Sequence, residues 1–476
     1  MQHAQRVVLR GLAAALTLLC GACSSPGDPG ARGAITGSRL LLPQVVYQGG
    51  PVLAAPAVVT VTFAGDALAG QLASFGQSVA SSSWWDAVRV GYCGTGATAC
   101  VGDGPPGTSI ELTTAPAPTY TDSAVGGPSS LKAWLSGAIM NGTLPAPAAN
   151  SPSNTVYVVY FPDTTAIDFD GIESCANDGF DGYHDWLSVG DQMVTYIVAM
   201  ECAALPPVFP TVAPTSVLQS ATITASHELV EASTDPVPPG TSQTSPGGFA
   251  LDSSVLDNWA WIDLTGGGEA ADMCVDLFGL NQDQTSDGTF TVQRIWSNAQ
   301  AASGVDPCNP MSGEVYFNAA PEKTAFFVVG VGDSVTFDVD AFSDGPVPPW
   351  TLSAQDWSDS SAPYLSFSIS GGASTDGGPV IKVSNGSKVQ VTMTLLMDPG
   401  ELPTGEADGS IISVSGDIDQ PTAAHFWPVA VMSPADAADA GVNVAEGARR
   451  DAVFSRRNGI RKKAPRPRPG TTRARF

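Results

Sequence analysis

One segment of the sequence combines an imidazole and two carboxylates at helical spacing. His227 and Glu231 are four residues apart, so on an α-helix both side chains point from the same face, one turn apart. One helix supplies two ligands to a metal ion with this spacing. Glu228 lies one position after His227, rotated by about 100° around the helix. In zinc peptidases with a His-Glu-x-x-His helix, the Glu at this position is the general base.

The second His of that motif is replaced here by Glu231, whose carboxylate oxygen is an acceptable zinc ligand. A catalytic zinc also needs a third protein ligand and an open position for water. We favour Asp272 or Glu269 as the third ligand, because both lie just before Cys274, whose disulfide would hold them in place. The residues therefore predict attack of zinc-activated water on a peptide carbonyl, with Glu228 as the catalytic base.

Two further residues compete for a place at this site. His184 and Asp235 are alternative metal-binding or substrate-binding candidates, and ordinary packing between aromatic neighbours is the other interpretation of His184. For the helix itself, the alternative is a solvated surface helix without a metal. Calcium is a second possible ion, since Asp168-Phe169-Asp170-Gly171 resembles the start of a calcium loop, but Gly179 stands where an EF-hand has its twelfth-position Glu.

The elements that must position these residues are predicted from periodicity and turn signals. A helix is expected over Val217–Thr234, begun by Pro214-Thr215-Ser216 and stopped by Asp235-Pro236. A second helical segment is expected over 66–85. Apolar runs at 58–63, 155–161 and 193–200 predict buried strands. Strands and helices thus alternate loosely, which predicts an α+β domain over residues 44–311.

From Ser312 the pattern becomes all-β. Seven short strand signals occur before residue 433, at 326–329, 334–339, 364–369, 380–383, 388–396, 410–414 and 426–432. Asn385-Gly386, between two of them, predicts a type I′ hairpin. Residues 312–433 are therefore expected to form an immunoglobulin-like β-sandwich.

The start of the chain and its cysteines predict export. Residues 1–23 have the form of a lipoprotein-type signal peptide, with Cys23 as the lipidated residue, and residues 24–43 read as a linker. Cys20 stands where such signals usually have Leu, so simple secretion is the alternative. Six cysteines remain, which allows 15 pairings, and we expect the sequential one in an oxidising compartment: Cys93 with Cys100, Cys175 with Cys202, and Cys274 with Cys308.

Charge is divided unevenly along the 476 residues, whose formal net charge is -25. Residues 24–448 hold 8 basic against 45 acidic residues, whereas the last 28 residues hold 11 basic and one acidic. The acidic body argues against a nucleic-acid partner. Residues 434–476 are expected to be a disordered basic tail; the sequence does not fix its role, and binding to anionic envelope polymers is one candidate.

The order of several motifs resembles the Exordium, or phosphate-induced protein, family, and more specifically its secreted bacterial relatives. The resemblance covers roughly residues 44–280 and rests on segments that stand in the same order, namely Tyr47-Gln48-Gly49-Gly50-Pro51-Val52-Leu53 and VVTVTF, Trp84-Trp85, Cys175, Gly182-Tyr183-His184, Thr234-Asp235-Pro236, and Glu269 to Cys274. The bacterial relatives carry a His-Glu-x-x-Glu segment, and the resemblance implies a zincin-like fold. The plant members lack those residues, so peptidase activity does not carry over from them.

Together these observations predict a multidomain protein: an α+β zincin-like domain, an immunoglobulin-like β-sandwich and a basic tail. The expected activity is that of a zinc-dependent metallopeptidase with a peptide or protein substrate, exported and held at the membrane only by its lipid anchor. The alternative is a non-catalytic cell-envelope protein that binds polysaccharide or protein.

Overall fold

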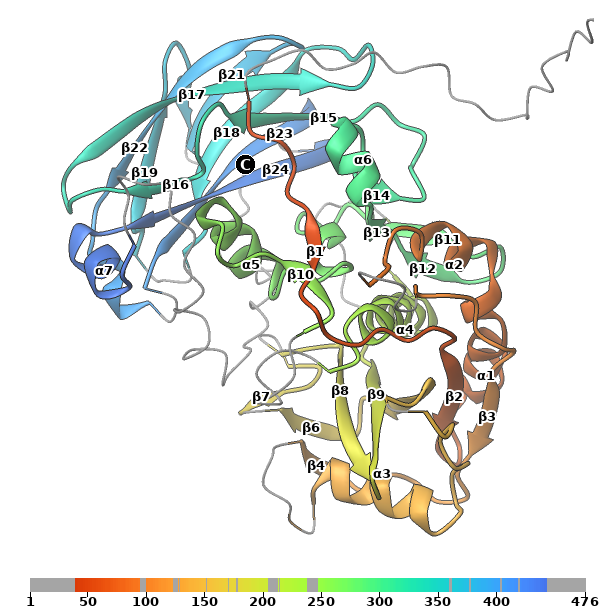
Figure 1. Cartoon of the computed structure of the whole chain (residues 1–476). Helices are drawn as coiled ribbons and strands as arrows, with labels where there is room; N and C mark the ends of the chain where they lie inside the picture. Colours follow the sequence, from red (N-terminus) through yellow and green to blue (C-terminus); the bar gives the residue numbers. More distant parts are fainter. Residues whose placement is uncertain are drawn as a thin grey trace, which may run out of the picture. The chain divides into compact units, whose positions relative to one another are not determined.

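The computed structural model describes residues 39–442 except for short internal stretches at 95–99, 123–126, 128, 151, 170, 177–178, 204–212, 214, 238–246, 359–361, 376–377, 403–404 and 418–419. The predicted signal peptide with Cys23, most of the predicted linker and the basic tail after residue 442 lie outside the described residues. The described part is rich in β-structure with few helices (Figure 1). None of its helices is long and apolar enough to span a membrane.

The first part of the chain is built on a five-stranded mixed sheet. The strands lie in the order β3 (Thr108–Glu111), β2 (Ala57–Thr62), β5 (Thr155–Pro162), β9 (Gln192–Glu201) and β8 (Gly182–Val189). All neighbours are parallel except β8, which runs antiparallel to β9. The three predicted strands are confirmed as β2, β5 and β9. Their sequences are nearly continuous apolar runs because both faces of the sheet are covered.

Helices and a small sheet cover the two faces. Alternate residues of β5 and β9 belong to two different apolar clusters, as the two-residue period of a strand requires. One cluster includes residues of α1 (Ala69–Ser78) and α4 (Val217–Thr234). The other includes residues of α3 (Leu131–Met140) and of the small sheet formed by β4 (Thr119–Asp122), β6 (Ala166–Phe169) and β7 (Ile172–Glu173).

Helix α4 has the bounds that the sequence predicts. Ser216 caps its first turn in a capping box with Gln219, and the helix ends before Asp235. The predicted helix over 66–85 is wrong in detail, because it is divided into α1, a 3-10 turn at Val79–Ser81 and α2 (Ser83–Val88). The break follows from Ser82, which is extended and caps α2 by accepting a hydrogen bond from Trp85 N.

The segment after α4 folds over that helix as short elements. They are β10 (Phe249–Leu251), η2 (Leu256–Asn258), α5 (Trp259–Thr265), η3 (Asp272–Cys274), β11 (Gln284–Ser286), β12 (Thr291–Gln293), β13 (Ile295–Trp296), α6 (Asn298–Ser303) and β14 (Cys308–Asn309). β10 pairs with β1 (Val45–Tyr47), β11 with β12, and β13 with β14, all antiparallel. These two-stranded pairs place η3 and β12 next to α4.

The three described disulfides have the sequential pairing expected from the sequence: Cys93–Cys100, Cys175–Cys202 and Cys274–Cys308. The last of these joins η3 to β14. It therefore connects the short elements that lie over α4.

The second part is a β-sandwich of two sheets. Four strands form one sheet in the order β15 (Phe317–Pro321), β17 (Ser334–Ser343), β22 (Lys388–Leu395) and β19 (Leu365–Ile369). The other has the order β16 (Phe326–Val328), β24 (Gln420–Met432), β23 (Ala407–Asp417), β18 (Trp350–Asp356), β21 (Gly378–Val383) and β20 (Ala373–Thr375). Trp350, Val391 and Ile411 lie in the core between the sheets.

The predicted hairpin at Asn385-Gly386 is wrong. β21 and β22 flank this turn but belong to different sheets, so the turn carries the chain across the sandwich. A type I′ turn needs a positive φ at both central residues, and here only Gly386 has one, at 81°. The Asn385 side chain is used elsewhere, because its oxygen accepts a hydrogen bond from Ser343 N at 3.2 Å.

Both predicted ends of the folded body need correction. The linker was expected to reach residue 43, but Leu42 is buried and Leu40 N donates to Pro321 O at 2.9 Å. The tail was expected to begin at Pro434, but Pro434–Asp439 form helix α7, capped by Ser433. Ala437 of this helix is buried in an apolar cluster with Trp259 and Phe326, which explains why the segment is folded.

Candidate metal centre

Three elements bring ionisable side chains together beside the middle of α4. The helix carries His227, Glu228 and Glu231, β8 carries His184, and η3 begins at Asp272. His184 faces the helix because alternate residues of a strand point to opposite faces, so its neighbour Tyr183 packs in the cluster on the other side. The approach of β8 to α4 is close: a Cβ at Gly182 would lie 2.3 Å from Thr224 Cγ2.

His227 is held through one ring nitrogen and faces acids with the other. Its Nδ1 lies 2.9 Å from Gln293 Oε1, and its Nε2 lies 3.1 Å from Glu231 Oε1 and 3.5 Å from Asp272 Oδ1. Among the described residues, Nε2 is buried without an aligned hydrogen bond. An imidazole nitrogen directed at two carboxylates in this way is the arrangement that a cation between them would satisfy.

His184 has a different environment, because both of its ring nitrogens have hydrogen-bond partners. Nδ1 lies 3.2 Å from Glu228 Oε2 and 3.7 Å from Glu231 Oε2, and Nε2 lies 3.1 Å from Asp235 O. A carbonyl and a carboxylate both accept, so both nitrogens act as donors and the ring is an imidazolium. His184 therefore orients Glu228 and adds positive charge beside it.

The two acids before Cys274 both reach the cluster. Asp272 N donates to Glu231 Oε1 at 3.1 Å, and Asp272 Oδ2 accepts from Glu269 N at 3.3 Å. Ligand atoms of Glu269, Glu231 and His184 lie within 4.8 Å of one another, as do those of His227, Glu228 and Glu231. Glu231 belongs to both groups and is the centre of the arrangement.

Asp235 contributes its backbone and not its carboxylate. The carbonyl faces His184, while the side chain accepts from Gly248 N at 2.9 Å and so fixes the chain after α4. Asp235 is one of six sequence candidates for a metal or substrate contact besides Glu228, and its carboxylate has this separate structural contact.

Burial and charge perturb the ionisation of the cluster. Burial lowers the pKa of His184, but the hydrogen bond with Glu228 and the negative charges of Glu269 and Glu231 outweigh it and raise the pKa to about 9. For His227, burial also opposes the charged form, yet Glu231 and Glu228 raise its pKa well above the usual value. Burial and the charges of Asp272 and Glu269 raise the pKa of Glu231 to about 8, although His227 lowers it. The cluster has more acids than bases and favours the uptake of cations.

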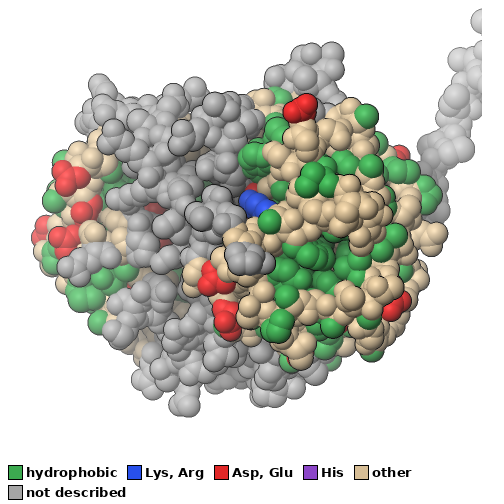
Figure 2. All heavy atoms as spheres, turned by 90° about the horizontal axis from the view of Figure 1, so that it is seen from below, with side chains coloured by type: hydrophobic (Ala, Val, Ile, Leu, Met, Phe, Trp, Pro, Cys, Tyr) green, Lys and Arg blue, Asp and Glu red, His purple; other side chains and the backbone are tan. Residues whose placement is uncertain are grey.

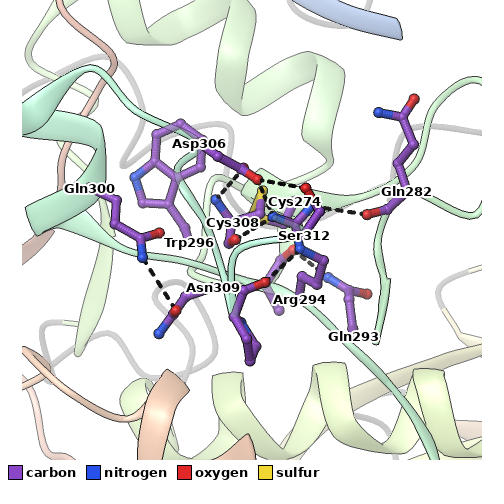
Figure 3. Close-up of a disulfide and its surroundings, with 12 residues drawn as sticks. Cys274, Gln282, Gln293, Arg294, Trp296, Gln300, Asp306, Cys308, Asn309 and Ser312 are labelled. Carbon is purple, nitrogen blue, oxygen red and sulfur yellow. Dashed lines mark hydrogen bonds and ion pairs between the residues drawn. A yellow bond between two sulfur atoms is a disulfide. The ribbon is translucent and has the colours of Figure 1, made fainter. Parts of the chain in front are cut away.

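Gln293 is a site residue that the sequence reasoning missed. Besides its contact with His227, its amide nitrogen donates to Ala271 O at 2.7 Å, and its backbone N donates to Ser226 Oγ at 2.9 Å. The next residue, Arg294, hydrogen-bonds Cys308 O beside the Cys274–Cys308 disulfide, as Figure 3 shows. The one signal available in the sequence was an amide in a strand that is otherwise buried, which is too common to mark a site.

The residues fit a zinc ion in their donor set. Ligand atoms of His227, Glu228 and Glu231 lie within 4.8 Å of one another, and Asp272 Oδ1 lies 3.5 Å from His227 Nε2. These are nitrogen and carboxylate donors of the kind that zinc accepts, and Gln293 Oε1 lies 2.9 Å from the other ring nitrogen of His227. His184 Nδ1 lies 3.2 Å from Glu228 Oε2 and 3.7 Å from Glu231 Oε2, so His184 contacts the same two acids. All the proposed donors were expected from the sequence, whereas Gln293, which contacts His227, was not.

The cluster is enclosed. His227 is 7% exposed and Glu228 is 1% exposed. On the face of the described part seen in Figure 2, acidic side chains are scattered over the surface and no imidazole is visible. The chemistry of the cluster is thus removed from bulk water, which strengthens electrostatic interactions within it.

A second group of acidic side chains lies where α5 and the start of β23 come close together. Oxygens of Asp263 on α5, and of Glu406 and Asp408 at the start of β23, lie within 4.8 Å of one another. Burial and the charges of Asp263 and Asp356 raise the pKa of Asp408 well above its usual value.

The calcium loop considered in the sequence begins at Asp168. The Asp168 carboxylate accepts a hydrogen bond from Gly171 N at 3.0 Å, and Asp170 lies outside the described residues.

No protein-family model matches the chain, and no curated protein matches it significantly. Among solved structures, domains 4 and 5 of the S-layer protein SbsC match 25% of this chain at 15% identity and a TM-score of 0.17, and the chain covers 46% of that structure. A conjugative transposon lipoprotein from Bacteroides eggerthii matches 24% of this chain and 95% of its own, at 10% identity and a TM-score of 0.19. The titin M3 domain matches 25% and 95%, at 11% identity and a TM-score of 0.15. None of these three is an Exordium-type protein or a zinc peptidase, and similarities at such TM-scores do not bear on function.

Proposed function

We propose that this protein is an exported zinc-dependent hydrolase that cleaves peptide bonds, and that its α+β part is a zincin-like metallopeptidase domain. One observation carries the proposal: His227 Nε2 is buried and directed at Glu231 Oε1, 3.1 Å away, and at Asp272 Oδ1, 3.5 Å away. His227, Glu231 and Asp272 are the metal ligands in this proposal, with Glu269 as the alternative third ligand. The three disulfides support export into an oxidising compartment, and the lipid anchor at Cys23 remains part of the proposal.

When bound, zinc would supply a Lewis acid and lower the pKa of water. Glu228 lies one residue from the His ligand and would accept the proton of the attacking water on a carboxylate oxygen. His184 donates through Nδ1 to Glu228 Oε2, which keeps that carboxylate in one orientation. Because Asp235 O holds the other nitrogen of His184, the imidazolium stays in place while Glu228 gains and loses its proton.

The test measures zinc and peptide cleavage in the same preparations. We expect one zinc per chain by elemental mass spectrometry, with zinc lost in His227→Ala and retained in Glu228→Gln, and cleavage of a peptide library abolished in both. His425→Gln is the matched control, because His425 is an imidazole on β24 of the sandwich that packs against Tyr316 and Phe317. It should keep both zinc and cleavage. A folded wild-type protein without zinc would refute the proposal.

The second candidate is a metal-holding envelope protein without turnover, which binds polysaccharide or protein. The observation that favours it is the enclosure of the cluster, since Glu228 is 1% exposed and a substrate must reach it. Structural zinc sites are closed, whereas catalytic ones keep a position for water. One zinc per chain, no cleavage in the peptide library, and a melting temperature that falls on chelation would establish this second function.

A further inference from the structure

The side chain of Gln293 has a single possible orientation. Its amide nitrogen lies 2.7 Å from Ala271 O, a carbonyl that can only accept, so the nitrogen must be the donor there. The amide oxygen is therefore the atom 2.9 Å from His227 Nδ1. Because that oxygen can only accept, Nδ1 of His227 must carry a proton.

This proton decides what the other nitrogen of His227 can do. With Nδ1 protonated, the neutral ring has its lone pair on Nε2, and Nε2 is the atom directed at Glu231 and Asp272. A ring nitrogen directed at carboxylate oxygens is satisfied either by its own proton or by a cation that takes the place of that proton. The tautomer set by Gln293 is thus the one in which His227 can bind a metal together with both acids.

The backbone of Gln293 is fixed from two sides. Its N donates to Ser226 Oγ, on the residue before His227, and its O accepts from Trp84 Nε1 at 2.8 Å. The following residue, Arg294, is held by hydrogen bonds to Gln282 O, Pro310 O and Cys308 O. Figure 3 shows Gln293 beside this Arg294 network and the disulfide. The amide is therefore placed by the surrounding chain and not by its contact with His227.

We propose that Gln293 is a positioning residue of the metal centre, which holds His227 in its Nδ1-protonated tautomer and so presents Nε2 to the metal. The proposal rests on the zinc site proposed above. The side chain of Gln293 hydrogen-bonds His227 Nδ1 and Ala271 O, so in this proposal its effect on the metal passes through the His227 ring.

The experiment compares zinc affinity, by competition with a chromophoric chelator, in the full chain and in three variants. Gln293→Met keeps the approximate volume but removes the acceptor, and should bind zinc 10- to 100-fold more weakly. Gln293→Glu keeps an acceptor for Nδ1 and should stay within a few fold of wild type. Gln284→Met is the matched control, because Gln284 lies directly opposite Gln293 in the β11–β12 pair, and its side-chain nitrogen hydrogen-bonds Thr215 and Asn281 rather than a residue of the cluster.

A second readout separates positioning from general loosening of the fold. In the zinc-loaded protein with ¹⁵N-labelled histidine, the Nδ1 proton of His227 should exchange slowly in wild type and Gln284→Met, and faster in Gln293→Met. Zinc bound equally well by wild type and Gln293→Met would overturn the positioning role and leave the zinc site intact. If Gln293→Met does not fold, a folded Gln293→Glu that loses zinc 10-fold or more also overturns it. A wild type that binds no zinc would overturn the proposed function and, with it, this inference.

Discussion

Removal of the Cys274–Cys308 disulfide should weaken metal binding by more than its effect on stability explains. Cys274 is the last residue of η3, which begins with Asp272, and Cys308 O accepts a hydrogen bond from Arg294, next to Gln293. The disulfide therefore fixes one proposed metal ligand and the partner of another. In Cys274→Ala/Cys308→Ala both Asp272 and Gln293 should move, and we expect at least a tenfold loss of zinc affinity.

The structure offers a matched control for the stability effect. The closed chain segment has a sequence separation of 34 for Cys274–Cys308 and 27 for Cys175–Cys202. Loop-closure entropy predicts losses of about 3.8 and about 3.5 kcal/mol on removing them. The two double variants should therefore be destabilised almost equally, although Cys175–Cys202 packs in the cluster on the other face of the sheet.

The assay is chelator competition at a temperature where circular dichroism shows all three proteins to be folded, with urea unfolding of the zinc-free proteins to check that the stability losses match. We expect weaker zinc binding in Cys274→Ala/Cys308→Ala alone. Equal zinc affinities in the two double variants at matched stability would refute the reasoning, because the disulfide near the site would then act only through the unfolded chain.

Three further predictions concern ionisation and packing. Burial lowers the pKa of His425 to about 4 from its usual 6.5, so the unfolded chain binds a proton that the native state does not, and stability falls as the pH drops from 6.5 towards 4. Between pH 7.5 and 5 this contribution should fall by about 2 kcal/mol. Urea unfolding should show it as a loss of stability in the wild type relative to His425→Gln, because the other titrating groups are common to both proteins. Burial and two neighbouring carboxylates raise the pKa of Asp408. Ionisation of Asp408 at higher pH therefore opposes folding, and Asp408→Asn should raise the melting temperature at pH 8 but not near pH 3. Stabilisation of equal size at both pH values would contradict this. A loss of stability in Asp408→Asn that is confined to calcium-containing buffer would indicate a bound cation. A Cβ at Gly182 would lie 2.3 Å from Thr224 Cγ2, so Gly182→Ala should lower the unfolding free energy by roughly 1–3 kcal/mol and weaken zinc binding. Gly137→Ala in α3 is the control, because a Cβ there meets nothing within 4 Å. It should not destabilise the protein in the same thermal scan.

Features that depend on residues close together in the sequence could be predicted from it. Ser216 and Gln219 form a capping box, and Asp235-Pro236 ends the helix, so α4 has its predicted bounds. The buried strands β2, β5 and β9 are long apolar runs. In contrast, β18 was not predicted, because Trp350–Asp356 is buried on both faces while mixing Thr, Ser and Gln with apolar residues, and so shows neither alternation nor a continuous apolar run.

The candidate site could likewise be predicted from the sequence only in part. The helical period alone relates His227 to Glu231, and the nearness of Asp272 to Cys274 correctly suggested that the acids before this disulfide lie close to the helix. The roles of the two imidazoles could not be read from spacing, because they depend on which atoms reach the second ring nitrogen. An accepting amide from β12 leaves Nε2 of His227 for a cation, whereas a backbone carbonyl occupies the second nitrogen of His184. Those partners are 66 and 51 residues away in the chain, so only the tertiary fold distinguishes the proposed metal-binding histidine from the one that orients a carboxylate.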